Sequence, residues 1–333
     1  MAKDTSKNCC EQFKTVIGGQ ALIEGIMMRG PEKDATVVRS KEGLQVEVKD
    51  RVIRPKNSPA NLPLIRGVVN FFDSQVTGVK ALMKSADFAP EEVQEKPSKL
   101  DAWLEKKMGN KKFQSFVVGF AVFLGLAMSI GLFFLLPMVI SSVLTNWIHS
   151  NLLLNLIEGL VRIILFTTYI ILVSKMKDMK RVFSYHGAEH KTIRWYEAGL
   201  PLTVENIQKQ TRLHPRCGTS FLLVVMILSI LVFSVSSAAL LSVIPKLALM
   251  RGSFLYSLIM VCFKLLLLPL VVAFSYEINR FVGRHDNRFS RMITAPGMWF
   301  QNFTTNEPDD SMIEVAFAAV EAVLPQEEGA VRW

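Results

Sequence analysis

The sequence predicts a polytopic α-helical membrane protein with four spans and a small cytoplasmic α+β portion. Three observations support this prediction. Half of the 333 residues are hydrophobic and only 20% are charged, which excludes an intrinsically disordered chain. The apolar residues are concentrated in four long runs, which is typical of membrane spans and argues against a purely soluble enzyme. Lysine and arginine, finally, are scarce in two loops and abundant in the remaining ones.

Each of the four apolar runs is long enough to cross a bilayer, which takes about 20 residues. They are residues 113–144, 152–174, 220–244 and 254–276. The first run is longer than one crossing needs, so we expect it to tilt or to bend near Pro137. Core helices of a large soluble protein are the alternative, but such helices rarely stay apolar on every face for so long.

The orientation of the spans follows from the positive-inside rule. Residues 1–112 hold 20 of the 38 lysines and arginines, residues 175–219 hold 9, and residues 277–333 hold 5. Of the two opposite loops, 145–151 has none and 245–253 has two. We therefore expect a multi-pass protein with both termini and the 175–219 loop in the cytoplasm. The lipid bilayer, and anionic lipid in particular, is then an expected partner of the basic face.

The N-terminal region has the pattern of a small β unit followed by a helix. Residues 35–39 are apolar and β-branched, residues 44–48 alternate apolar and polar, and 41–43 between them indicate a hairpin turn. Residues 18–31 carry four glycines, which favours a compact turn over a phosphate cradle, because no GKS/T ending follows. Residues 62–84 have an apolar stripe at helical spacing, which predicts a helix packed on the β unit or lying on the membrane surface.

The rest of the chain adds a linker and a tail helix. Residues 88–99 are rich in Pro, Glu and Lys, which is typical of a linker. Thr304 and Glu307 have the spacing of a capping box and predict a helix that runs to about Leu324. We expect five parts: a cytoplasmic N-terminal α+β region with an amphipathic helix (1–112), a first helical membrane pair (113–174), a cytoplasmic histidine-rich loop (175–219), a second membrane pair (220–276) and a cytoplasmic tail (277–333).

Three ionisable residues lie inside the predicted spans, where an unpaired charge is expensive. Glu158 and Arg162 are four residues apart on one helix face, so they can pair locally. Lys264 is expected near the depth of Arg162, so Glu158 could bridge the two helices. The group is either a structural pin between helices or part of a polar path or substrate groove.

The segment that follows the second span contains H-x-x-E-H, the reversed form of the zincin motif. Positions i and i+4 project from one face of a helix, so His186 and His190 can bind one metal ion. Glu189 beside them could take a proton from a bound water. Glu197, seven residues after His190, falls on the same side two turns later and is a candidate further ligand.

A second cluster contains His214 and Cys217, which have the two-residue separation typical of zinc ligands. If these two join His186 and His190 on one ion, the tetrahedron closes and the site is structural. If only three side chains bind, a position is left for water and Glu189 is the base. The third alternative is that the histidines bind no metal and only form hydrogen bonds at the lipid interface.

Several arginines surround these clusters and could hold an anionic substrate or a lipid head group. Nonspecific contact with anionic lipid is the simpler interpretation. The arginines that we expect at such an anion site are Arg194, Arg216 and Arg284.

The sequence resembles the YqhQ-like family of bacterial membrane proteins over about residues 15–325. The resemblance implies a bacterial inner-membrane protein, and the family is usually described as predicted metal-dependent enzymes. It supplies no substrate. The strings that carry the resemblance are GGQALIEGIMMRGP (18–31), LPLIRGVVNFFDS (62–74), SYHGAEHKTIRWYEAG (184–199), LTVENIQKQTRLHPRCGTSF (202–221) and GRHDNRFSRMITAPGMWFQNFTTNEPDD (283–310).

The preferred hypothesis is a metal-dependent enzyme, hydrolytic in type, with its site at the cytoplasmic membrane face. Its substrate would be anionic or embedded in the membrane, and its cofactor a divalent metal, with zinc the first candidate. In this hypothesis Glu189 is the general base. The expected ligands are His186, His190 and His214, with Cys217 or Glu197 completing the coordination sphere.

The rival hypothesis is a non-enzymatic membrane scaffold or biogenesis factor with a structural metal site. Residues 1–112 carry 20 basic against 15 acidic side chains, and residues 175–219 carry 9 against 4. Such a basic face could dock a ribosome, a translocon or another membrane complex. A small-solute transporter is the third candidate, but three intramembrane charges are thin support for a polar path.

Overall fold

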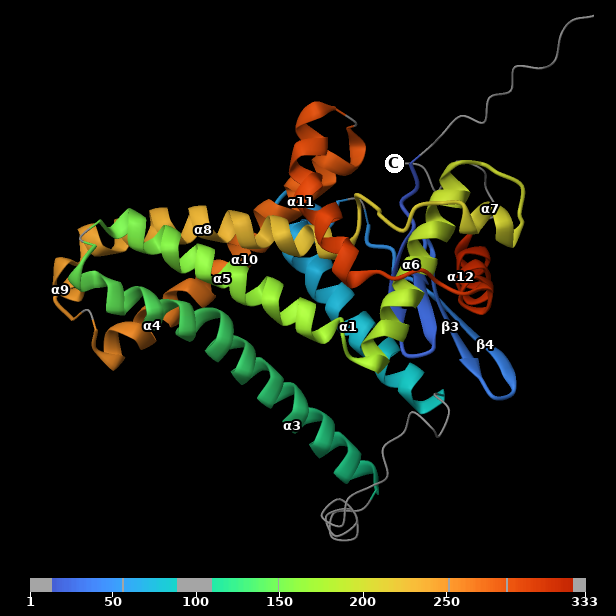
Figure 1. Cartoon of the computed structure of the whole chain (residues 1–333), viewed down its shortest axis with the longest axis horizontal. Helices are drawn as coiled ribbons and strands as arrows, with labels where there is room; N and C mark the ends of the chain where they lie inside the picture. Colours follow the sequence, from blue (N-terminus) through green and yellow to red (C-terminus); the bar gives the residue numbers. More distant parts are fainter. Residues whose placement is uncertain are drawn as a thin grey trace, which may run out of the picture. The chain divides into compact units, whose positions relative to one another are not determined.

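The computed structural model describes residues 14–55, 57–88, 110–148, 150–250, 252–285 and 287–325. These residues are mostly helical, with one four-stranded antiparallel sheet (Figure 1). The chain forms two compact units. The first unit gathers residues 1–90, 170–225 and 272–333, and the second consists of residues 91–169 and 226–271.

The sheet of the first unit is a meander in which neighbours in sequence are neighbours in space. The expected hairpin is confirmed: β3 (Lys33–Ser40) and β4 (Gly43–Asp50) pair antiparallel. Gly43 has a φ of +119°, which only glycine adopts readily and which the tight turn requires. The alternating apolar side chains of β4 are exposed, and β2 and β3 carry the buried face.

The glycine-rich segment contains the expected tight turn, but the residues on either side of the turn form strands, so the segment is a second hairpin. It forms β1 (Gly18–Leu22) and β2 (Gly25–Arg29), joined by a two-residue turn. Glycine is needed here for close backbone approach: a Cβ on Gly25 would lie 2.5 Å from the carbonyl oxygen of Val37. The turn itself holds Glu24 at a φ of +51°.

Three helices pack around this sheet. α12 (Asp310–Val323) lies against β2 and β3 and also contacts α6 (Lys177–Glu197), which in turn contacts β1. The shared core is apolar and fully buried, with Ile26, Val37, Tyr185, Ile313 and Ala316 among its members. The histidine-bearing helix is therefore held in place by a core that the N-terminal and C-terminal segments build together.

The predicted amphipathic helix is α1 (Ile65–Phe88), and it packs on the sheet through its small residues. Gly78 and Ala81 are buried, whereas the apolar stripe is largely exposed. Arg66 near its start forms an ion pair with Glu277 of α10 (Phe254–Arg284). The helix thus has a small-residue face toward the sheet and an apolar face without cover from the described residues.

The tail contains two helices where one was expected. α11 (Arg288–Thr304) precedes α12, so the expected capping box at Thr304 was wrong, because this residue ends a helix and does not begin one. The N-cap of α12 is Asp309, whose carboxylate accepts a hydrogen bond from the Met312 N–H at 2.9 Å. Aspartate is one of the preferred N-cap residues, and the Thr-x-x-Glu pattern a few residues earlier had led to the wrong N-cap prediction.

Four helical stretches are long and apolar enough to cross a membrane: residues 119–143, 152–173, 218–243 and 254–284. Between 11% and 33% of their most apolar windows are buried inside the protein. The low buried share leaves many apolar side chains of these stretches exposed, as is typical of helices that contact lipid.

The first stretch is interrupted where a bend was expected. α3 (Asn110–Ile130) passes through a π-helical turn (Gly131–Leu135) into α4 (Leu136–Val143). Pro137 has no N–H to donate to the carbonyl of Phe133, four residues earlier. Arg162 of α5 (Asn151–Val173) donates its Nε–H to that carbonyl instead, at 2.8 Å.

Candidate metal centre

The centre of the candidate site is α6, which places His186 and His190 on one face. Their ring centroids are 4.4 Å apart. His190 is 1% exposed and His186 is partly buried. Gly187 between them is packed against the backbone of Asn306, so the helix approaches the segment before α12 closely. The i, i+4 spacing therefore places the two rings next to one another on one helix face, as the sequence predicted.

Both imidazoles are oriented by backbone carbonyls. His186 Nδ1 lies 2.8 Å from the Thr304 oxygen, and His190 Nδ1 lies 2.6 Å from the Arg212 oxygen. Because a carbonyl oxygen only accepts, each Nδ1 carries a proton, and in the neutral form of each ring Nε2 keeps its lone pair. This is the arrangement by which metal-ligating histidines are fixed in one tautomer.

Cys217 adds a third potential metal ligand beside the two Nε2 atoms. Its Sγ is 3.1 Å from His186 Nε2, and the ligand atoms of His186, His190 and Cys217 all lie within 4.8 Å of one another. Burial opposes ionisation of the Cys217 thiol, whereas the hydroxyl and the N–H of Thr219, 3.3 Å and 3.5 Å from Sγ, favour the thiolate and lower the pKa of the thiol. Two imidazole nitrogens and one sulfur are ligands that zinc prefers.

Glu189 is buried beside this group, at 4% exposure. The N–H of Gly19 donates to its carboxylate, and a Cβ on Gly19 would lie 2.9 Å from the carboxyl carbon. Burial raises the pKa of Glu189 to about 8, against the influence of His186. A cation nearby would return the group to its ionised form.

Two buried atoms of the site have no hydrogen-bond partner among the described residues. They are His190 Nε2 and Glu189 Oε2. Burial lowers the pKa of His190 to about 4, so its ring is neutral at physiological pH. Glu189, His190 and Cys217 all line one cavity of about 370 Å³. Unsatisfied buried polar atoms are costly in a folded protein, and a ligand that both could contact removes that cost.

The structure does not bring Glu197 or His214 into the three-atom group. Glu197 accepts from the Thr15 N–H at 2.8 Å and forms an ion pair with Arg216. Its spacing from His190 is correct in angle, but seven residues advance about 10 Å along the helix axis. His214 Nε2 lies 3.7 Å from the Glu197 carboxylate, and its ring is 5.5 Å from that of His190.

The predicted arginines divide between two places. Arg194 donates its Nε–H to the Leu213 carbonyl at 2.7 Å, and Arg216 pairs with Glu197. Both line a cavity of about 480 Å³ that also includes His214 and Arg291. Arg284 is exposed at the last residue of α10 and does not line that cavity.

The three ionisable residues of the apolar helices come together in the second unit. Glu158 Oε1 is 3.0 Å from an Arg162 guanidinium nitrogen and 2.5 Å from Lys264 Nζ. All three side chains are at most 7% exposed. The carboxylate therefore bridges α5 and α10.

The comparisons with known proteins identify the family of the chain. Residues 62–326 match the family described as "Protein of unknown function (DUF1385)". The chain belongs to this family. It is also 32% identical over 314 residues to "Uncharacterized protein YqhQ" of Bacillus subtilis (strain 168), which covers 92% of each chain. No solved structure matches the chain.

The DUF1385 match includes all three side chains of the group, but sequence reasoning missed the groups that orient them. Thr304 and Arg212 act through backbone carbonyls, which carry no residue-specific signal. Gln301 was also missed: its side chain accepts from the His214 N–H and donates to the His214 carbonyl, both at 2.7 Å. Gly19 could have been suspected, because a glycine within a strand often marks the close approach of another group.

Proposed function

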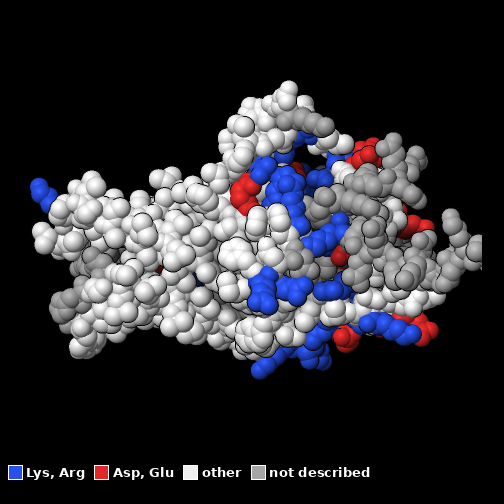
Figure 2. Space-filling model, turned by 90° about the horizontal axis from the view of Figure 1, so that it is seen from above, with Lys and Arg blue, Asp and Glu red and all other residues white. Residues whose placement is uncertain are grey.

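We propose that the chain is a multi-pass protein of the bacterial inner membrane, with its four apolar stretches as spans. Both termini and the 175–219 loop face the cytoplasm in this proposal. Support comes from the charge distribution of the loops and from the low burial of the apolar windows. On the face shown in Figure 2, lysine and arginine side chains gather over the first unit and are scarce over the second.

The exposed stripe of α1 supports the same proposal. Phe72, Val76 and Val79 are 49–58% exposed on a helix whose opposite face packs on the sheet. An apolar helix face flanked by basic residues is typical of helices that lie in the membrane interface. The first unit would then rest on anionic lipid at the cytoplasmic surface.

Within the first unit we propose a zinc-dependent hydrolase site. One observation carries this proposal: His186, His190 and Cys217 converge with both Nδ1 protons already donated to carbonyls, and with Glu189 beside them. Three protein ligands are the number found in catalytic zinc sites, which keep one position open. A fourth protein ligand would favour the structural alternative, and His214 faces Glu197.

In this proposal each side chain has a defined task. The two Nε2 atoms and the thiolate hold the ion. A bound zinc ion would supply Lewis acidity and make a water molecule acidic enough to react near neutral pH. Glu189 Oε2, which is buried and has no partner among the described residues, takes the proton.

The neighbouring cavity indicates the substrate class. Arg194 and Arg216 line it, and His214 and Arg216 also line the cavity that contains Glu189. A guanidinium group is well suited to bind carboxylate or phosphate. We therefore propose an anionic substrate, held by these arginines with its reactive bond toward Glu189.

The experiment is elemental analysis of the purified protein. We expect about one zinc per chain in the wild type and less than a tenth of that in the His186→Ala/His190→Ala double variant. The matched control is His285→Ala, because His285 is exposed, stacks on Phe281 and is not one of the three converging residues. Equal zinc in all three proteins, or none in the wild type, would contradict the proposal and leave a basic membrane scaffold.

A further inference from the structure

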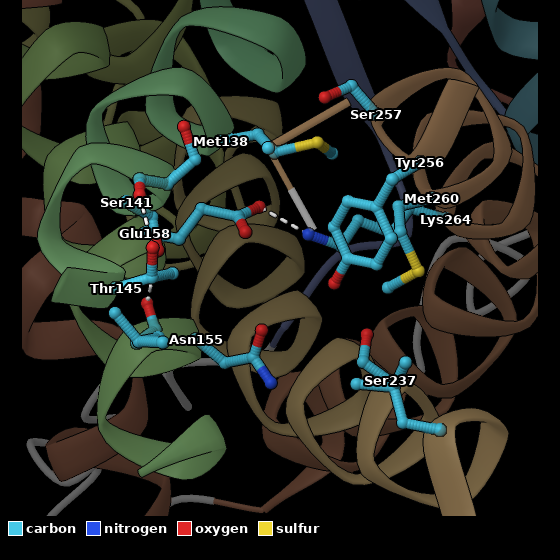
Figure 3. A pocket seen from close by; sticks show the side chains of 14 residues that line it. Met138, Ser141, Thr145, Asn155, Glu158, Ser237, Tyr256, Ser257, Met260 and Lys264 are labelled. Atoms are coloured by element: carbon cyan, nitrogen blue, oxygen red, sulfur yellow. Dashed lines mark hydrogen bonds and ion pairs between the residues drawn. The ribbon is translucent and has the colours of Figure 1, made fainter. Parts of the chain in front are cut away.

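A small pocket lies inside the second unit, among helices that are otherwise apolar (Figure 3). Its volume is about 50 Å³. A water molecule needs about 10–15 Å³ of such a cavity, so the pocket has room for a group of about three to five heavy atoms. The polar side chains that line it include Ser141, Asn155, Glu158, Ser237, Tyr256 and Lys264.

The charged side chains at this pocket do not balance. Glu158 is the only carboxylate in residues 110–169 and 226–271 of the sequence. It faces two cations, Arg162 and Lys264, and both bind the same oxygen, Oε1. Figure 3 shows the Glu158 carboxylate and the Lys264 ammonium group reaching toward one another. With all three side chains ionised, the group carries one positive charge in excess, which is expensive among apolar helices.

Arg162 has further partners that Lys264 does not share. Its Nε–H binds the Phe133 carbonyl, and its guanidinium carbon lies 5.1 Å and 5.6 Å from the ring centroids of Phe134 and Phe233. Arg162 does not line the pocket, whereas Lys264 does. The excess charge is therefore presented to the pocket by the lysine.

A second observation is independent of the charges. Ser237 lines the pocket and is 1% exposed, and its hydroxyl has no hydrogen-bond partner among the described residues. Serine hydroxyls in helices ordinarily bond to a carbonyl of the preceding turn, as Ser229 does to Met226 at 2.7 Å. The Ser237 hydroxyl is a buried donor that a ligand in the pocket can satisfy.

We propose that this pocket binds one small, singly charged oxyanion, a carboxylate or a phosphate group. The Lys264 ammonium and the Ser237 hydroxyl donate hydrogen bonds to it, and its charge neutralises the excess of the cluster. The pocket has room for a free carboxylate or for the phosphate of an acidic lipid, whose remaining atoms would lie outside it. The proposal does not depend on the zinc site, which belongs to the other unit.

The first test measures binding of radiolabelled acetate by equilibrium dialysis, with the full chain in phosphatidylcholine nanodiscs. We expect one acetate per chain in the wild type and at least a tenfold weaker affinity in Lys264→Met, which leaves a neutral Glu158–Arg162 pair. Lys246→Met is the matched control, because Lys246 lies in α9 (Pro245–Ala248) outside the pocket and should bind acetate like the wild type.

Ser237→Ala keeps the test decisive if Lys264→Met does not fold. If the Ser237 hydroxyl does not contact the acetate, its removal would leave the acetate affinity unchanged. If it donates a hydrogen bond to the acetate, its removal should weaken the affinity several-fold. Native mass spectrometry in nanodiscs with phosphatidylglycerol distinguishes the sources: one retained phosphatidylglycerol that excludes acetate indicates the lipid. Binding of neither acetate nor phosphatidylglycerol to the wild type, or affinity unchanged in both variants, would overturn the proposal.

Discussion

The residues of the candidate metal centre were predictable to different degrees. His186 and His190 could be found from their spacing, because helix periodicity alone puts them on one face. Cys217 could be found only as a member of a zinc-like pair with His214. In the structure His214 does not join Cys217 in the group. Gln301 forms hydrogen bonds with the N–H and the carbonyl of His214, and the imidazole of His214 faces Glu197. No sequence pattern reports such a backbone contact.

Glu189→Gln tests the assigned proton acceptor. We expect unchanged zinc content, because the carboxylate is not among the three converging ligands, and a loss of hydrolysis of about 10²–10⁴-fold. The readouts are elemental analysis and turnover of p-nitrophenyl phosphate and p-nitrophenyl acetate. The control is Glu205→Gln, because Glu205 is exposed on α7 (Val204–Gln208) and pairs with Lys209. If the Glu189 variant hydrolyses a wild-type substrate at the wild-type rate, Glu189 is not the base.

At the scale of helices and strands, the sequence was informative wherever periodicity or turn chemistry dominated. The β3–β4 hairpin and α1 followed from such patterns. An irregularity near Pro137 was also predictable, because proline frees the carbonyl four residues earlier, and the structure has a π-helical turn there. The hydrogen bond from Arg162 to this carbonyl could not be predicted, since it joins two different helices. The missed boundary was in the tail, where two N-cap candidates, Thr304 and Asp309, lie close together.

Asp309→Ala tests the observed start of α12. The lost cap should lower the free energy of unfolding by about 1 kcal/mol, because the Met312 N–H loses its acceptor. Asp309→Asn should retain most of the stability, since asparagine caps about as well. Thermal or denaturant unfolding of the purified protein in detergent measures both. A helix that began at the expected capping box would be indifferent to both substitutions and sensitive to Thr304→Ala.

At the scale of the whole molecule, three segments far apart in sequence build one unit that contains the site. The N-terminal strands contribute Gly19, α6 contributes both histidines, and the tail contributes the Thr304 carbonyl. Composition and loop charge were sufficient to predict the apolar helices and a separate α+β portion. They were not sufficient to predict that the tail helix completes the core of the sheet. The spacing of its apolar residues indicates a buried helix but does not indicate which element it packs against.

The most direct test of the central claim is zinc-edge X-ray absorption spectroscopy of the purified full-length protein. A centre built from His186, His190 and Cys217 predicts two imidazole nitrogens at about 2.0 Å, one sulfur at about 2.3 Å and one further light atom. The sulfur contribution should disappear in Cys217→Ser. A zinc shell without sulfur, or a sulfur signal that persists in that variant, would contradict the claim.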